Sequence, residues 1–262
     1  MNQQEKCLWL IRTLLDEMPQ YQDVMIPTLE MKRWNLLRSL MNVRPPQPAA
    51  AEFLRIQDAF LRQMTREKGV VSLESLAPCS LDNRLYVWQG DITTLQCDAI
   101  VNAANSQLLG CFSPCHGCID NIIHTMAGVQ LRLACHDLMA AQGHEEPTGQ
   151  AKITPGYNLP CKYVIHTVGP IVDGPLTKEH ERLLASCYRA CLETAAQNGC
   201  QSIAFCCIST GVFMFPNQRA AEIAVDTVRK YYAETGSPIK TVFNVFKDLD
   251  MHIYQDMLYP AP

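Results

Sequence analysis

Apolar positions in the first part of the chain recur at the spacing of an α-helix. One such set runs from Leu8 to Leu15 and a second from Leu29 to Leu40. The prolines of the RPPQPAA segment interrupt this pattern, because proline cannot continue a helix, and a third apolar face follows over residues 51–65. No strand pattern precedes residue 80. We therefore expect residues 1–80 to form a helical N-terminal extension, in which we find no candidate chemistry.

From Arg84 onward, short apolar runs alternate with helical patterns. Strands are predicted at 84–90, 97–104, 152–157, 163–169, 202–209 and 241–246. Helices are predicted from Ile119, at about 177–197, at 217–232 and at 249–258. Buried strands separated by helices indicate an α/β fold with a sheet between helices. Because ligands of such sheets bind beyond the carboxyl ends of the strands, the loops there are the candidate sites.

Composition and charge narrow the class of protein. The 262 residues are 48% hydrophobic and 18% charged, so the chain can bury a large core. The net charge of −4 argues against a general nucleic-acid binder. No apolar run reaches the length of roughly 18–20 residues that spans a membrane, and the first residues lack the features of a signal peptide. We expect a cytoplasmic protein whose 13 cysteines are reduced, several of them packed as small apolar residues.

Polar residues follow three of the predicted strands. Asp91, after Gly90, can bind an exocyclic amine or a ribose hydroxyl, or can cap a turn. Asn102 and Asn105 flank two alanines and can bond ribose hydroxyls, or can form Asx turns. The small-residue loop at 209–216 leads into a helix and can cradle a phosphate with backbone amides. Its Phe213 and Phe215 can stack on a sugar or base, or fold back on the core.

Three cysteines and a histidine crowd into eight residues before the helix at Ile119: Cys111, Cys115, His116 and Cys118. Thiolate and imidazole suit Zn²⁺, and three protein ligands with one open position is the arrangement of catalytic zinc. The spacing is not that of a zinc finger, because no second CxxC follows. The alternative is a loop with free, redox-sensitive thiols.

Two further histidines are predicted to be structural. His124 lies one turn past Asp120, and His166 lies inside a predicted buried strand. We expect both in the core, each bonded to the backbone or to another side chain.

Six short motifs occur in one order along the chain: GDIT at 90–93, VNAAN at 101–105, IDNxIHxxAG at 119–128, TGxAxIT at 148–154, YVIHTVGP at 163–170 and STGVF at 209–213. Together they resemble a macrodomain, the ADP-ribose-binding α/β module, over about residues 84–260. GCFSPCHGC, at 110–118, replaces the Gly-rich stretch of ordinary hydrolytic members. In this the chain resembles zinc-containing microbial macrodomains, which also have a helical N-terminal extension. The resemblance implies a mixed sheet between helices over residues 81–262.

The resemblance also implies a substrate-binding set spread over the loops after the strands. Asp91 would bind the adenine amine with Ile92 beside it, and Phe246 would stack near adenine. Asn102 and Asn105 would face the distal ribose. The residues that would border or wrap the diphosphate and distal ribose are Ile119, Ser209, Thr210, Gly211, Val212 and Phe213.

A metal site and a catalytic pair come from the same resemblance. Zn²⁺ would be held by Cys111, His116 and Cys118, which leaves Cys115 as an extra thiol. Asp120 matches the acid of hydrolytic macrodomains, and we group Asn105 with it as catalytic.

The function expected from the resemblance is zinc-dependent hydrolysis of mono-ADP-ribose from modified protein side chains, with an Asp/Glu ester as the favoured linkage. The partners would be ADP-ribose and a mono-ADP-ribosylated protein, such as a lipoyl-carrier protein modified by a sirtuin-like transferase. No nucleic acid and no membrane are expected as partners. The alternatives are a reader that binds ADP-ribose without turnover and a deacetylase of O-acetyl-ADP-ribose.

Overall fold

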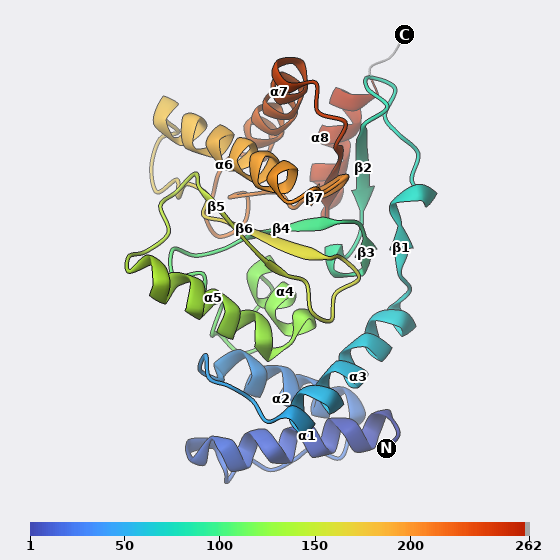
Figure 1. Cartoon of the computed structure of the whole chain (residues 1–262), viewed down its shortest axis with the longest axis vertical. Helices are drawn as coiled ribbons and strands as arrows, with labels where there is room; N and C mark the ends of the chain where they lie inside the picture. The colour runs from blue at the N-terminus through green and yellow to red at the C-terminus, as the bar shows by residue number, and fades with distance from the viewer. Residues whose placement is uncertain (260–262) are drawn as a thin grey trace.

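A six-stranded mixed sheet forms the centre of the molecule in this computed structural model, which describes residues 1–259 (Figure 1). The strand order is β2-β8-β7-β4-β6-β5, and all neighbours are parallel except β5 and β6. In chain order, the strands are β2 (Leu85–Gln89), β4 (Ala99–Ala103), β5 (Ala151–Pro155), β6 (Tyr163–Thr167), β7 (Ser202–Phe205) and β8 (Lys240–Val245). The predicted α/β fold with a mixed sheet is therefore confirmed.

Helices cover both faces of the sheet (Figure 1). One face carries α6 (Lys178–Gln197), α7 (Asn217–Thr235) and α8 (Asp248–Leu258), and the other carries α4 (Ile119–Ala127) and α5 (Val129–Gln142). The sequence analysis missed α5, because the residues it buries include Arg132 and therefore break the apolar pattern. Within residues 1–259, no helix combines the length and apolar character needed to cross a membrane.

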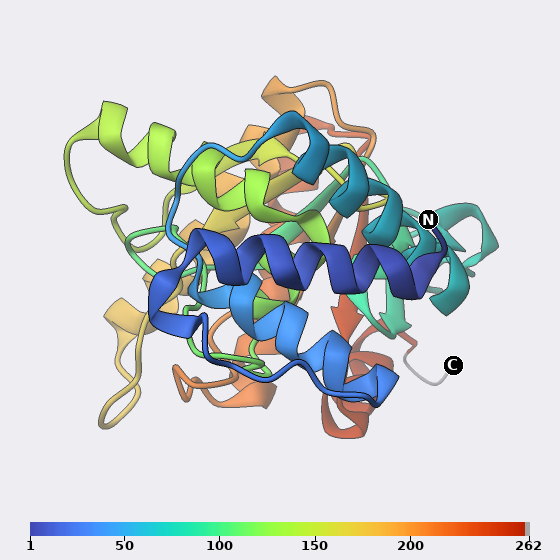
Figure 2. The ribbon, with the colours of Figure 1, turned by 90° about the horizontal axis from the view of Figure 1, so that it is seen from below.

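Three N-terminal helices pack together beneath α4 and α5 (Figures 1 and 2). They are α1 (Gln3–Glu17), α2 (Glu30–Val43) and α3 (Ala51–Lys68), and a 3-10 turn, η1 (Pro19–Tyr21), follows α1. Their leucines and isoleucines form a second hydrophobic cluster, which includes Leu10, Leu14, Leu37 and Leu61. Both α2 and α3 contact α4, so the three helices lie against the α4 side of the sheet.

The predicted strands are generally longer than the observed ones. The run expected at 202–209 leaves the sheet after Phe205, and its last residues form a loop instead. A two-residue strand, β1 (Val71–Ser72), pairs with β3 (Leu95–Gln96) in a region where no strand was expected. Two residues are too few to show an alternating pattern. All 13 cysteines are free thiols, and most are buried.

Candidate active site

The carboxyl ends of five parallel strands meet at one edge of the sheet, as expected for this class of fold. Asp91 follows β2, Phe246 follows β8, and the loop from Ser209 follows β7. Asn105 follows β4, whose pairing with β7 ends at Ile100. The topology therefore gathers residues that are far apart in the sequence.

Asp120 lies at the centre of this edge, in the first turn of α4. Its side chain is buried, and its two carboxylate oxygens accept hydrogen bonds from different amides. Asn102 Nδ2 donates to Oδ1 at 2.8 Å, and Asn105 Nδ2 donates to Oδ2 at 3.3 Å. Burial raises the pKa of Asp120 to about 6, against the lowering effect of the Asn102 bond and of the Arg132 charge. A buried carboxyl group with a raised pKa is suited to moving a proton.

Asn102 does not take the position expected of a ribose ligand. It is fully buried, and its amide nitrogen contacts Asp120 and the Nδ1 atom of His166, at 3.2 Å. We correct the expectation accordingly: Asn102 is enclosed in the sheet, where it contacts Asp120 and His166 and supports the carboxylate. Asn105 is partly exposed, and its Oδ1 accepts from Gln107 in an Asx turn, which is one of the two roles considered for it.

Cys111, His116 and Cys118, the three ligands that the family resemblance implied, lie close together in the structure. Their ligand atoms all lie within 4.8 Å of one another, with Cys111 Sγ 3.7 Å from His116 Nδ1. Two sulfurs and one imidazole form a donor set that fits Zn²⁺. Burial, with a contribution from the neighbouring Cys111, raises the pKa of the Cys118 thiol to about 11, against the lowering effect of the hydrogen bond from the Asn121 backbone. A bound cation would favour the thiolate form and so oppose this rise in the pKa.

Cys115 is set apart from this group. Its sulfur lies 3.3 Å from the hydroxyl of Ser39 and donates to the carbonyl of Asn35, both on α2. Cys115 also has a positive φ of 53°, which turns the chain between Cys111 and His116. The fourth residue of the cluster thus faces the N-terminal helices.

The two histidines assigned to the core are both buried, as predicted. His166 bonds to the Thr154 hydroxyl at 2.9 Å and to Asn102, and burial lowers its pKa to about 3. His124 differs from the expectation, because neither ring nitrogen has a hydrogen-bond partner among residues 1–259. Its ring packs against the backbone of Gly110, where a Cβ atom would come within 2.8 Å. Burial, with the neighbouring His166 adding to it, lowers the pKa of His124 as well.

Asp91 forms the far end of the edge, and the N-terminal extension reaches it. Its Oδ1 accepts from the backbone and hydroxyl of Thr93, at 3.0 and 2.6 Å, and its Oδ2 pairs with Lys68 of α3 at 3.1 Å. Burial alone would raise the pKa of Asp91, but the Thr93 bonds and the Lys68 charge together lower it. Ile92 beside it is buried, whereas the Phe246 ring is 78% exposed beyond β8.

The loop after β7 presents its backbone to solvent. The amides of Gly211, Val212 and Phe213 donate to no protein acceptor in the part of the chain that the structure describes. Ser209 is buried in a left-handed conformation with φ of 65°, and its hydroxyl packs against Gly169, where a Cβ atom would come within 2.1 Å. Within residues 1–259 that hydroxyl has no hydrogen-bond partner.

Other members of the expected set divide between core and surface. Phe215 is in the core, whereas Phe213 is partly exposed. Thr210 is partly exposed, and its hydroxyl donates to the Cys207 carbonyl. Ile119, in the first turn of α4, packs partly buried on the main core.

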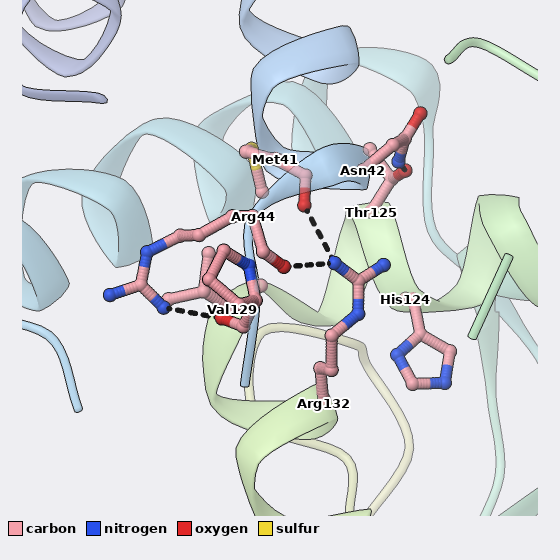
Figure 3. A pocket seen from close by; sticks show the side chains of 9 residues that line it. Met41, Asn42, Arg44, His124, Thr125, Val129 and Arg132 are labelled. Carbon is pink, nitrogen blue, oxygen red and sulfur yellow. Dashed lines mark hydrogen bonds between the residues drawn. The ribbon is translucent and has the colours of Figure 1, made fainter. Parts of the chain in front are cut away.

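Sequence reasoning missed Arg132, a buried arginine beside the site. Its guanidinium donates to the carbonyls of Leu109, at 2.7 Å, and Met41, at 3.2 Å, and lies 4.2 Å over the Phe112 ring. Figure 3 shows it directed toward the end of α2, in a pocket that His124 also lines. No sequence signal pointed to Arg132, because α5 itself was not recognised.

Comparison with known proteins agrees with this arrangement. The model of the Macro domain family matches residues 101–224. A protein-ADP-ribose hydrolase of Treponema medium is 57% identical over 98% of this chain and 100% of its own length. The structure of a Trypanosoma brucei macrodomain in complex with ADP-ribose superposes with a TM-score of 0.65 at 31% identity, covering 84% of this chain and 94% of that one. An Oceanobacillus iheyensis macrodomain with ADP gives 0.60 at 40% identity, covering 66% and 89%.

Proposed function

This chain belongs to the macro domain family, and from that premise we propose that it is a protein-ADP-ribose hydrolase that releases mono-ADP-ribose from an ester with a protein carboxylate. The observation that carries the proposal is the buried Asp120, held by two amides directly after the Cys111, His116 and Cys118 cluster. A module that only bound ADP-ribose would not need this combination.

Along the sheet edge, successive groups of residues would bind successive parts of ADP-ribose, from the adenine to the diphosphate. The Asp91 carboxylate would accept a hydrogen bond from the adenine amine, and the exposed Phe246 ring would stack nearby. The free amides of Gly211, Val212 and Phe213 would bind the diphosphate. Backbone amides neutralise phosphate charge without basic side chains, which is consistent with the net charge of −4.

We propose further that Cys111, His116 and Cys118 hold a zinc ion. When bound, such an ion with an open coordination position polarises an oxygen of the substrate or lowers the pKa of a water. Cys115 is not part of this ligand group, because its sulfur faces α2.

Asp120 would act on the water that attacks the ester. Its carboxylate would accept a proton from this water, while the amides of Asn102 and Asn105 hold it in one orientation. Hydrolysis breaks a C–O bond of the ester and forms a new C–O bond to the oxygen of the water, whose proton passes to Asp120, so the products are free ADP-ribose and the protein carboxylate. The ester linkage, and a lipoyl-carrier protein as a candidate target, rest on the likeness to zinc-containing macrodomains.

A panel of substrates tests the proposal. Zinc-loaded protein would be incubated with Asp/Glu-linked, Ser-linked and Arg-linked ADP-ribosyl proteins and with O-acetyl-ADP-ribose, and free ADP-ribose would be measured. We expect release from the carboxylate ester. Binding of ADP-ribose with no release from any substrate would support a reader instead, and turnover of O-acetyl-ADP-ribose alone would support a deacetylase.

A further inference from the structure

The loop that carries the three candidate ligands is held from outside by a helix of the N-terminal extension. Residues 110–118 contain no helix or strand, and α2 lies beside them. Arg38 Nη2 donates to the carbonyl of His116 at 2.7 Å. One turn further along α2, the Asn42 side chain accepts the backbone amide of Cys115 at 3.0 Å. Both contacts fix the loop backbone rather than its thiols.

Asn121 connects the same arginine to the other two ligand residues. This side chain is fully buried in the first turn of α4. Its backbone N–H donates to Cys118 Sγ at 3.4 Å, and its Nδ2 donates to the carbonyls of Cys111, at 3.2 Å, and Ser113, at 2.9 Å. Its Oδ1 accepts from Arg38 through Nη2, at 2.8 Å, and Nε, at 3.3 Å. Arg38 and Asn121 together therefore contact all three ligand residues.

The direction of the Asn121 amide follows from these partners. A carboxamide has one acceptor end and one donor end. The arginine fork, which can only donate, takes the acceptor end, so the donor end must face the loop carbonyls. Without Arg38, the buried amide oxygen loses both guanidinium donors and keeps only the longer contact with the Thr125 hydroxyl, at 3.5 Å, and the His116 carbonyl loses its bond. The loop would then sample more conformations, and ordering it around a metal would cost more conformational entropy.

We propose that Arg38 is a positioning residue for the metal site, and that α2 thereby gives the N-terminal extension a part in metal binding. The inference rests on the metal site of the proposed function. Partners that orient metal ligands from outside typically account for a factor of about 10–100 in metal affinity. We expect Arg38→Ala to weaken zinc binding by about that factor.

The test uses the full chain and a readout that a general loss of stability would not produce. Zinc affinity would be measured by competition with a chromophoric chelator, and the absorption of Co²⁺-substituted protein would report the thiolate ligands directly. Arg38→Lys keeps the charge but cannot form the fork, so we expect it to lose affinity too. Lys32→Ala, an exposed position on the same helix, is the control and should bind zinc as the wild type does.

The possible results separate this inference from the proposed function. Weaker zinc binding and an altered Co²⁺ spectrum in both Arg38 variants, with melting temperature and ADP-ribose affinity close to wild type, would support it. If Arg38→Ala fails to fold, Arg38→Lys carries the comparison. Wild-type zinc affinity in a folded Arg38 variant would overturn the positioning role and leave the proposed function intact. Wild-type protein that takes up no metal would overturn the metal site itself.

Discussion

At the scale of single residues, the buried carboxylate of Asp120 is the polar group on which the candidate site depends. A buried carboxylate is costly unless it is hydrogen-bonded, and Asp120 meets this requirement through Asn102 and Asn105. Asn102 in turn contacts His166, which bonds to Thr154 of β5. The Asp120 carboxylate is therefore oriented by a chain of contacts that runs through the sheet.

Asp91 gives the first prediction at this scale. Replacing Asp91 by Ala should weaken ADP-ribose binding by about 1–3 kcal/mol, because the adenine amine loses a charged acceptor. Calorimetry measures the effect. Asp91→Asn keeps an oxygen that can accept the hydrogen bond from the Thr93 backbone, so it should lose less affinity than Asp91→Ala. Asp137→Ala, at an exposed position, is the control and should bind ADP-ribose as the wild type does. Unchanged affinity in Asp91→Ala would remove Asp91 from the adenine site.

The buried His166 predicts a pH dependence of stability. Its pKa is about 3 in the folded protein and 6.5 as the ordinary value, so between these the unfolded state binds the extra proton. Stability should therefore fall as the pH drops from 6.5 toward 3, with His166 contributing up to about 1.4 kcal/mol per pH unit.

Urea unfolding between about pH 4 and pH 6 checks this prediction. His166→Gln should flatten the dependence of the unfolding free energy on pH, whatever its effect on stability at neutral pH. The exposed His252→Gln is the control for removal of an imidazole. An equally steep dependence in His166→Gln would mean that His166 is protonated in the folded state.

At the scale of elements, the loop at 110–118 and helix α4 form one unit. Cys118 is both a candidate ligand and the N-cap of α4, where its sulfur accepts the Asn121 amide. Residue types and spacing were enough to predict the crowding of three cysteines and a histidine and the start of the helix at Ile119, whereas the choice of Cys111, His116 and Cys118 as ligands rested on the family resemblance. The contacts of the loop with α2 could not, because nothing local in the sequence links residue 38 to residue 116.

The dual role of Cys118 allows a clean test of the metal site. Cys118→Ser keeps an N-cap acceptor for α4 but replaces the soft thiolate ligand, so we expect it to lose zinc while the helix remains. Cys115→Ser changes the thiol that faces α2 and should retain one zinc per chain. Metal analysis of the purified variants decides the matter. If Cys118→Ser retained zinc and Cys115→Ser lost it, the ligand would be Cys115 and not Cys118.

At the scale of the whole molecule, the sheet brings the residues of the candidate site together at one edge. The N-terminal helices contact this site at both of its ends. Lys68 of α3 pairs with Asp91, and Arg38 of α2 contacts the Cys/His loop. The alternation of strands and helices was enough to predict the sheet and the edge to which the carboxyl ends of its parallel strands point. It could not predict that the N-terminal extension reaches this edge. Such long-range contacts depend on how layers stack, which local periodicity does not encode.

The central claim is that this chain breaks the bond to ADP-ribose at the Cys/His cluster and Asp120, and does not merely bind the nucleotide. Most of the binding energy would come from the Asp91 end and the loop after β7, whereas the cluster acts in the transition state.

The most direct measurement compares release and binding in the same variants. The rate of ADP-ribose release from an ester-linked protein would be determined for wild type, Cys111→Ala and His116→Ala, together with the Kd of free ADP-ribose and the melting temperature. We predict that release is abolished in both variants, that Kd changes far less, and that both remain folded. Release at the wild-type rate from a folded His116→Ala protein, or no release from zinc-loaded wild type on any linkage, would contradict the account.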